Sequence, residues 1–357
     1  MQGIWLDISS ILKLIAENQN ISDLHLSAGD SVAFRYNWEI VRKEELGKIS
    51  DENMEIILRQ LLKNNPQRFE KFLSDKEADF AYISKDEVAY RVNAFMKTGR
   101  IWLVMRKIDR TPKKLSEIMF QENAEIIKQQ ILGSTKGLFL VTGPTWAWKS
   151  TSIVAMLDEI NQNEAGHIIT IEDPIEYVFE PKRSIISQRE IMHDTWSFNG
   201  AIKSALREDP DVIMVGEIRN AETAEAVLDL AETWHMVFST LHTNGAVSTM
   251  NRFLSFFSAE MQPGIMERLA DCLCGVLSQT LVKRKDGNGR VAVFELMLNN
   301  NAVRNNLKKR ELDQLSNILE TSSQNGMITM KQYAKKLLER WIVDQSEIEK
   351  LIKNRTF

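Results

Sequence analysis

GLFLVTGPTWAWKST, residues 137–151, joins an apolar run to a helical pattern through one short loop. A loop of the form G-x-x-x-x-G-K-[ST] between a strand and a helix is a P-loop, whose backbone N–H groups turn around phosphate oxygens. Residues 143–150 fit this form except at Trp148, where the pattern requires glycine. An indole at that position would fill the space of the phosphates. The stretch therefore predicts an α/β fold with a phosphate site in which one residue is out of place.

Apolar runs and helical patterns alternate on both sides of this stretch. Three further short, wholly apolar strands are predicted at 167–172, 211–217 and 236–242, and helices at 150–163 and 221–233. Such strands separated by helices indicate a parallel sheet that is covered on both faces. The last 60 or so residues are predicted to be helical.

The residues before the linker predict a separate, smaller α/β domain. A helix is expected within 1–20, and strands within 23–29, 32–44 and 87–108, with the pair in 32–44 turning at Asn37-Trp38. Arg110-Thr111-Pro112 breaks the pattern. We therefore expect an N-terminal domain at 1–112 and a second domain at 113–357.

Composition excludes several classes of protein. The chain has 357 residues, 43% of them hydrophobic, with a net charge of −4, so it is neither disordered nor a generally basic nucleic-acid binder. Its two cysteines, Cys272 and Cys274, cannot build a disulfide framework or a four-cysteine zinc site, and we expect them on different sides of one helix, as core residues of the fold rather than a metal site. No apolar run is long enough to span a bilayer. A cytoplasmic protein that docks at a membrane through partners is the expected class.

Carboxylates and a histidine follow the predicted strands. Glu172, Asp173 and Glu176 come after one strand, Glu217 ends the next, and His242 ends the last. Carboxylates at such positions hold Mg²⁺ or polarise an attacking water, and a histidine can sense the γ-phosphate. Each residue alone could equally be a solvated acid or a loop histidine. Their shared position at strand ends, where parallel sheets bind ligands, favours a phosphate enzyme.

These motifs resemble those of secretion-superfamily ATPases of the PilT type, which retract type IV pili. The resemblance covers about residues 20–345, and Asn306 departs from an apolar position of the family. It rests on five segments: GPTWAWKST (143–151), TIEDPIEY (170–177), SALREDPDVIMVGEIRNAET (204–223), AETWHMVFSTLHTN (231–244) and AVRNNLKK (302–309). It implies an N-terminal PAS-like domain, a RecA-like ATPase domain and a homohexameric ring.

The resemblance also implies an activity and a site. The activity is ATP hydrolysis with Mg²⁺, in which Glu176 polarises water, Ser150 and Glu217 hold the metal, and His242 couples phosphate state to domain position. Glu172 and the arginines Arg91 and Arg106, with Arg100 as a further candidate, complete the catalytic set. The nucleotide would be bound by Gly143, Pro144, Thr145, Trp146, Ala147, Trp148, Lys149, Ser150 and Thr151.

The implied partners are further copies of the chain, an inner-membrane pilus platform protein and a paralogous retraction ATPase, with no nucleic acid. The expected location is the cytoplasm, at the inner face of the membrane. Two alternatives stay open. One is a catalytically inactive ring subunit, and the other is a pilus-assembly or type II secretion ATPase of the same superfamily.

Tryptophan stands where glycine is expected at several positions. Glycine supplies only 16 residues, below its usual share of about 7%. Trp146, Trp148 and Trp234 occupy glycine positions of the family motifs, and Trp38, Trp102, Trp196 and Trp341 stand where glycine or another small residue would fit. We hypothesise that UGA codons are read as glycine in the source and appear as tryptophan in the printed translation. The rival hypothesis is a true tryptophan that blocks the P-loop.

Overall fold

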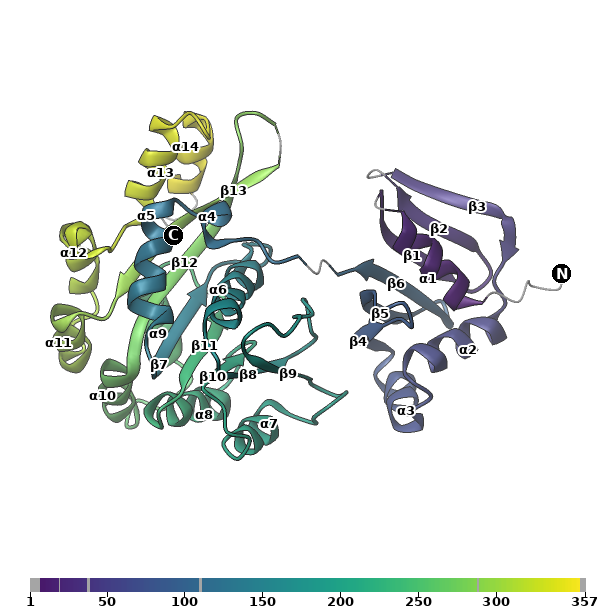
Figure 1. The fold of residues 1–357 in the computed structure, drawn as a ribbon, viewed down its shortest axis with the longest axis horizontal. Coiled ribbons are helices and arrows are strands. Elements are labelled where there is room, and N and C mark those ends of the chain that lie inside the picture. Colours follow the sequence, from purple (N-terminus) through teal and green to yellow (C-terminus); the bar gives the residue numbers. More distant parts are fainter. Residues whose placement is uncertain (1–6, 19, 37–38, 109–110, 288, 354–357) are drawn as a thin grey trace. The chain divides into compact units, whose positions relative to one another are not determined.

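The computed structural model describes residues 7–18, 20–36, 39–108, 111–287 and 289–353. Its internal contacts divide the chain into two compact units (Figure 1). Unit 1 comprises Met1–Thr111, Glu172–Phe179 and Gln188–Trp196; unit 2 comprises Pro112–Ile171, Glu180–Ser187 and Ser197–Phe357. Two short segments that follow the P-loop in sequence thus belong to the first unit.

Unit 1 contains a six-stranded sheet in the order β3-β2-β1-β6-β5-β4, in which all neighbours are antiparallel. The strands expected within 23–29, 32–44 and 87–108 are confirmed, while the turn at Asn37-Trp38 lies outside the described residues. The elements are α1 (Ile8–Glu17), β1 (Ile21–Ser27), β2 (Ser31–Tyr36), β3 (Glu39–Lys48), α2 (Asp51–Leu61), α3 (Pro66–Asp75), β4 (Glu77–Ile83), β5 (Ala89–Lys97) and β6 (Arg100–Lys107).

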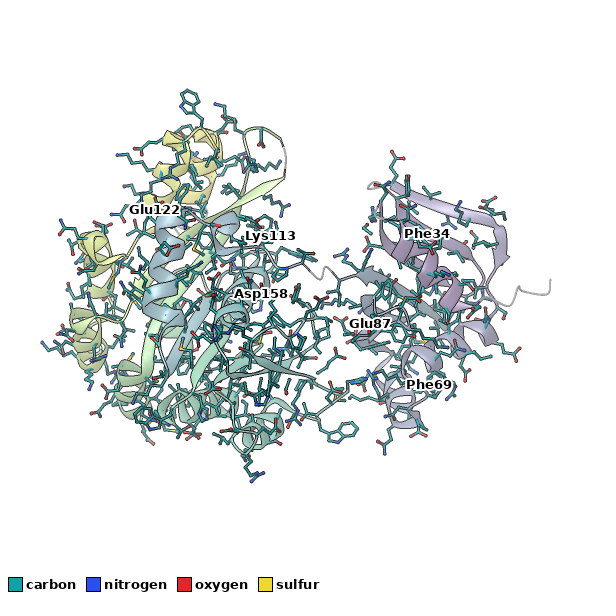
Figure 2. All side chains as sticks on the ribbon, viewed as in Figure 1. Phe34, Phe69, Glu87, Lys113, Glu122 and Asp158 are labelled. Carbon is teal, nitrogen blue, oxygen red and sulfur yellow. The ribbon has the colours of Figure 1, made fainter. Side chains whose placement is uncertain are left out.

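Local sequence explains the helices of unit 1. Asp7 caps α1 by accepting a hydrogen bond from the backbone N–H of Ser9, and Asn65 caps α3 in front of Pro66. Each helix turns one apolar face inward. Phe34 on β2 and Phe69 on α3, both labelled in Figure 2, are buried in the shared core.

The second sheet has seven strands in the order β13-β12-β7-β11-β10-β8-β9. The pairs of β7, β11, β10, β8 and β12 are parallel and only β12–β13 is antiparallel, among the pairs whose register is described. This confirms the predicted parallel α/β fold. The strands are β7 (Gly137–Thr142), β8 (His167–Glu172), β9 (Ile185–Glu190), β10 (Val212–Val215), β11 (Met236–Leu241), β12 (Leu273–Lys283) and β13 (Arg290–Leu298).

Helices cover this sheet and form the C-terminal part, as Figure 1 shows. The helical C-terminal part is confirmed over residues 301–353. The helices are α4 (Leu115–Ile118), α5 (Gln121–Ile127) continued by a π-helical turn (Lys128–Leu132), α6 (Lys149–Asn163), α7 (Phe198–Ala205), α8 (Ala221–Glu232), α9 (Ala246–Leu254), α10 (Gln262–Cys272), α11 (Asn301–Lys309), α12 (Gln314–Thr321), α13 (Met330–Glu339) and α14 (Gln345–Lys353).

One expectation is wrong. Cys272 and Cys274 do not share a helix, because α10 ends at Cys272 and Cys274 lies in β12. The run that follows is apolar on both faces, so its periodicity cannot separate a buried helix from a buried strand. Cys272 is buried and Cys274 is half-buried, and burial raises the pKa of the Cys272 thiol to about 12.

Candidate active site

The loop after β7 is shaped by its contact with β12. Gly143 has φ +152°, and a Cβ there would meet the backbone oxygen of Gln279, so only glycine fits. The buried Gln279 side chain donates from Nε2 to the carbonyl oxygen of Ala147. Sequence reasoning missed Gln279, although a polar residue within the apolar run of β12 is a signal that could have revealed it.

Three predicted site residues of unit 2 meet beside this loop. Lys149 Nζ donates to the carbonyl oxygens of Gly143 (2.9 Å) and Pro144 (3.1 Å) and lies 3.3 Å from His242 Nδ1. His242 Nε2 is 3.5 Å from Glu217 Oε1. A cation, an imidazole and a carboxylate therefore form one continuous cluster at the loop.

The parallel register explains why they meet. Leu241 pairs with Thr142, so His242 and Gly143 each come one residue after the end of neighbouring strands. Glu217 follows β10 on the other side of β11. His235, the other histidine of that motif, precedes β11 and lies at the opposite end of the strand.

Ser150 and Thr151 lie half-buried in the first turn of α6. A helix N-terminus is favourable for phosphate, because its first N–H groups have no carbonyl partner one turn earlier in the helix and its dipole favours negative charge. The Ser150 hydroxyl and the Glu217 carboxylate are hard oxygen donors, the type that Mg²⁺ takes when phosphates and waters complete its shell. Among the described residues, no group of three or more His, Cys, Asp and Glu side chains could hold a metal on its own.

Trp146 and Trp148 have left-handed backbones, with φ values of 69° and 65°. That region costs a residue with a Cβ free energy and is routine only for glycine. The Trp146 indole is 74% exposed, although tryptophan is usually well buried. Trp148 is half-buried beneath Lys113, a residue labelled in Figure 2, whose Nζ lies 4.7 Å from the ring centre.

Two tryptophans far from the loop in sequence show the same anomaly. Trp234 follows α8 with φ 66°, and Trp341 follows α13 with φ 57°. Their side chains are 73% and 76% exposed. By contrast, Trp102 lies in β6 and Trp196 is exposed, and neither has positive φ. Trp5 and Trp38 lie outside the described residues.

Glu176 and its neighbours belong to unit 1. Glu176 Oε1 accepts a hydrogen bond of 2.8 Å from Arg91 Nη1, and Asp79 binds the same guanidinium at Nη2 (2.7 Å). These carboxylates raise the pKa of Arg91, the hydrogen bond to Asp79 being the larger cause. Glu172 is buried and accepts from Gln188 Nε2 at 3.1 Å. The structure therefore brings Arg91 and Glu176 together.

Arg106 and Arg100 have other partners. Arg106 lies opposite Arg91 in the β5–β6 register, yet its Nε donates to Oδ1 of the buried Asp23 at 2.8 Å. Arg100 Nε is 3.6 Å from Asp51. The structure thus does not join these two arginines to Glu176.

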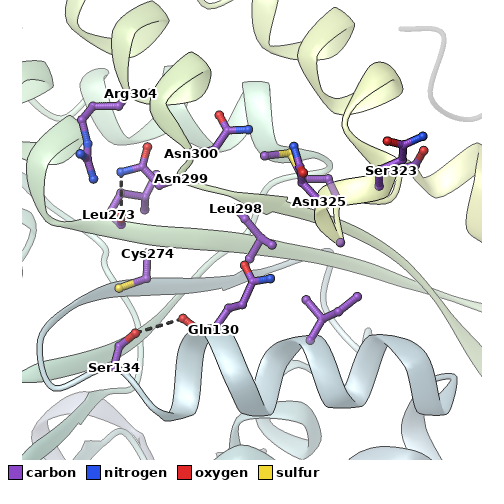
Figure 3. A pocket seen from close by; sticks show the side chains of 14 residues that line it. Gln130, Ser134, Leu273, Cys274, Leu298, Asn299, Asn300, Arg304, Ser323 and Asn325 are labelled. Carbon is purple, nitrogen blue, oxygen red and sulfur yellow. Dashed lines mark hydrogen bonds between the residues drawn. The ribbon is translucent and has the colours of Figure 1, made fainter.

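A hollow of about 730 Å³ lies at the end of the unit 2 sheet where β12 begins. It is lined near the starts of β7 and β12 by Leu273 and Cys274, and by Asn299 from the chain after β13 (Figure 3). Asn299 Nδ2 donates to the carbonyl oxygen of Leu273 at 2.7 Å. Because the P-loop follows the opposite end of β7, this hollow is separate from the phosphate site.

The parallel sheet, the loop after β7 and the strand-end residues define a protein of the α/β class with a candidate phosphate site at the carboxyl ends of its parallel strands. Residues 4–351 match the family model described as type II/IV secretion system protein. The chain therefore belongs to the type II/IV secretion system protein family. Among the described residues, no helix is both long and apolar enough to cross a membrane.

Relatives extend this similarity over nearly the whole chain. The chain is 39% identical to the type IV pilus retraction ATPase PilT of Pseudomonas aeruginosa, over 95% of this chain and 96% of that one. It is 40% identical to a twitching motility protein of Neisseria gonorrhoeae, over 85% and 79% of the two chains. A crystal structure of the pilus retraction motor PilT with bound ADP superposes with a TM-score of 0.83 at 35% identity, covering 96% of both chains.

Proposed function

We propose that the protein is a Mg²⁺-dependent ATPase that powers retraction of a type IV pilus. The observation that carries the proposal is the cluster of Lys149, His242 and Glu217 beside a P-loop at the carboxyl ends of parallel strands. The similarity to retraction ATPases along nearly the whole chain supports the direction of the motor. The similarity to the pilus assembly ATPase PilB of Pseudomonas aeruginosa covers only 58% of the chain, at 33% identity.

In this proposal the residues of unit 2 bind the nucleotide. The backbone N–H groups of residues 143–151 and the ammonium of Lys149 bind the phosphates. To do so, Lys149 exchanges its bonds to the loop carbonyls for bonds to phosphate oxygens. Ser150 and Glu217 hold Mg²⁺, which neutralises charge on the phosphates when it is bound. His242, between Lys149 and Glu217, responds to the presence of the γ-phosphate.

Glu176 orients the attacking water and accepts its proton. The water oxygen bonds to the γ-phosphorus while the bond from that phosphorus to the β–γ bridging oxygen breaks, giving ADP and phosphate. Arg91 holds the Glu176 carboxylate at 2.8 Å and can also neutralise charge on the transferring group. Glu172 supports the start of the segment that carries Glu176.

We further infer that positions 146 and 148 are glycine in the native protein. The left-handed backbone at both supports this, because glycine adopts it without strain. The same backbone at Trp234 and Trp341 supports one cause for all four. A UGA codon read as glycine provides such a cause, and UGG at any of the four positions in the gene would exclude it there.

As a motor, the protein would act as a homohexamer whose domains move with each hydrolysis step. Its partners would be an inner-membrane pilus platform protein and a paralogue, as PilU of Pseudomonas aeruginosa is a pilus ATPase 34% identical to this chain. The proposed location is the cytoplasm, at the inner face of the membrane, with no role for nucleic acid. Residues 1–112 and 113–357 would be the two moving domains, with Glu172–Phe179 and Gln188–Trp196 moving with the first.

The test compares three proteins: the chain with tryptophan at 146 and 148, its Trp146→Gly/Trp148→Gly variant, and that variant with Lys149→Ala added. We expect ATP binding and hydrolysis only in the double glycine variant. Expression of that variant in a bacterium that lacks its retraction ATPase should restore twitching. If the chain with tryptophan at 146 and 148 binds ATP as tightly as the glycine variant does, the assignment of glycine is contradicted. No ATP binding by either chain would contradict the ATPase.

A further inference from the structure

Side chains of β9 hold the segment that carries Glu176. Residues 175–180, all described, have no regular secondary structure. Gln188 donates from Nε2 to the carbonyl oxygen of Tyr177 (2.7 Å) and accepts at Oε1 from the N–H of Phe179 (2.8 Å). Two residues further along β9, Glu190 accepts at Oε2 from the N–H of Ile175 (3.1 Å). Alternate side chains of one strand thus bind alternate backbone groups of this segment.

Glu190 also binds the edge of the unit 1 sheet. β4 is the last strand of that sheet, so one side of its backbone lacks a strand partner. The N–H of Ala81 on β4 donates to both oxygens of Glu190, at 3.1 and 2.9 Å. A single carboxylate therefore accepts hydrogen bonds from two backbone segments that are remote in sequence.

The two attachment points lie beside the two members of the Arg91–Glu176 ion pair. Ile175 directly precedes Glu176, and Ala81 lies opposite Arg91 in the β4–β5 register. Glu190 is 2% exposed, so water does not compete for its oxygens. Burial raises the pKa of this carboxyl, while the hydrogen bonds from Ile175 and Ala81 act in the opposite direction.

We propose that Glu190 is a positioning residue that fixes Glu176 relative to Arg91 by joining Ile175 to Ala81. Glu190 itself touches no nucleotide in this proposal and takes no part in proton transfer. The inference rests on the proposed function, because it assigns Glu176 the role of orienting water. Its structural part, the joining of the two segments, can be tested without hydrolysis.

The variant is Glu190→Gln, made in the chain with glycine at 146 and 148. The amide keeps the shape but replaces one acceptor oxygen by an NH₂ donor. Because the Ala81 N–H contacts both oxygens of Glu190, it faces this donor in either orientation of the amide. Glu70→Gln, an exposed carboxylate on α3 of the same unit, is the matched control. We expect Glu190→Gln to lower kcat about 10- to 100-fold, the usual effect of a small misplacement, with the Kd for ATP unchanged.

Two readouts separate positioning from a general folding defect. When Glu176→Gln is already present, Glu190→Gln should not lower the residual rate further, because the group that it positions is gone. Hydrogen exchange of peptides covering 77–83 and 172–179 should speed up at least about 10-fold, while peptides of α2 keep the parent rate. Glu70→Gln should change neither.

The possible failures are distinguishable. A parent that does not hydrolyse ATP contradicts the proposed function, and hydrogen exchange then still decides whether Glu190 joins the two segments. An active parent with an unchanged kcat in Glu190→Gln overturns the positioning role. Equal rate losses with and without Glu176→Gln also overturn it, as does unchanged exchange in both peptides.

Discussion

Replacing Trp234 and Trp341 by glycine should stabilise the protein, although both substitutions remove large apolar side chains. Each residue directly follows the C-cap residue of a helix, Thr233 of α8 and Arg340 of α13, with φ of 66° and 57°. A left-handed backbone costs a residue with a Cβ roughly 1–2 kcal/mol, and glycine is the residue that helices prefer at this position. Relief of that strain is the gain expected at each site.

The stabilisation lost with the two indoles is smaller than this gain, because the indoles make few contacts. They are 73% and 76% exposed, and each lies beneath one lysine, Lys136 at 4.1 Å and Lys285 at 4.6 Å from the ring centres. An exposed cation–π contact contributes about 0.5–1 kcal/mol. The net gain is about 0.5–1 kcal/mol per site, and the two sites share no lysine, so the double variant should gain about 1–2 kcal/mol.

Urea unfolding followed by far-ultraviolet circular dichroism measures this gain without relying on tryptophan fluorescence. The midpoint of the Trp234→Gly/Trp341→Gly variant should rise by about 0.5 M at an unchanged slope. Trp196→Gly is the matched control, since its indole is 66% exposed and its backbone is not left-handed, and we expect no gain.

Trp102→Gly should lower the midpoint, because it removes contacts with Phe95 and Lys97 and places glycine inside a strand. A fall in the midpoint of the double variant as large as that of Trp102→Gly would refute the reasoning. The indoles would then stabilise the fold, and the left-handed backbone would give no support for glycine.

Three further predictions concern unit 2. Glu217→Gln, made with glycine in the P-loop, should reduce the contribution of Mg²⁺ to the free energy of ATP binding by about 1–3 kcal/mol, the value of a contact to a charged group. Titration of ATP binding with Mg²⁺ measures this contribution, and an unchanged titration would remove Glu217 from the metal site. Gln279→Leu leaves the carbonyl oxygen of Ala147 without its buried donor and should lower stability by about 1–3 kcal/mol, read from the urea midpoint; an unchanged midpoint would show that the bond contributes nothing. Cys272, with a pKa of about 12, should stay a protonated thiol at pH 8 and react with iodoacetamide far more slowly in the folded than in the urea-unfolded protein, whereas equal rates would contradict its burial.

The sequence predicted those parts of the site that regular elements place. Glu217 and His242 end apolar runs, and parallel strands bring their carboxyl ends to one edge, so the order of strands and helices along the chain is enough to predict their meeting with Lys149. The arginines could be placed on strands, but not with their partners. Arg91 and Arg106 lie opposite each other in neighbouring strands, and nothing local determines that one binds Glu176 and the other Asp23.

The backbone partners of the polar residues that support the site could not be predicted, and the reason is physical. A glutamine or glutamate in a strand pattern indicates a solvated face, since these residues are mostly exposed. Gln279 and Glu190 are buried because each meets a backbone group from a distant part of the chain that has no strand or helix partner. Only tertiary structure brings donor and acceptor together.

The need for such residues is nevertheless visible in the backbone. A buried N–H or carbonyl that no ladder satisfies requires a side-chain or water partner. Here the backbone groups without a ladder partner belong to the edge strand β4 and to the irregular segment that carries Glu176. Alternate residues of β9 provide their hydrogen bonds. In proteins of this architecture, polar residues two apart on a strand that follows an irregular catalytic segment are therefore candidates for its support. Mutation of Gln188, which binds Tyr177 and Phe179, should loosen that segment without affecting the Ala81 contact of Glu190. Hydrogen exchange should then become faster within 172–179 and stay unchanged within 77–83.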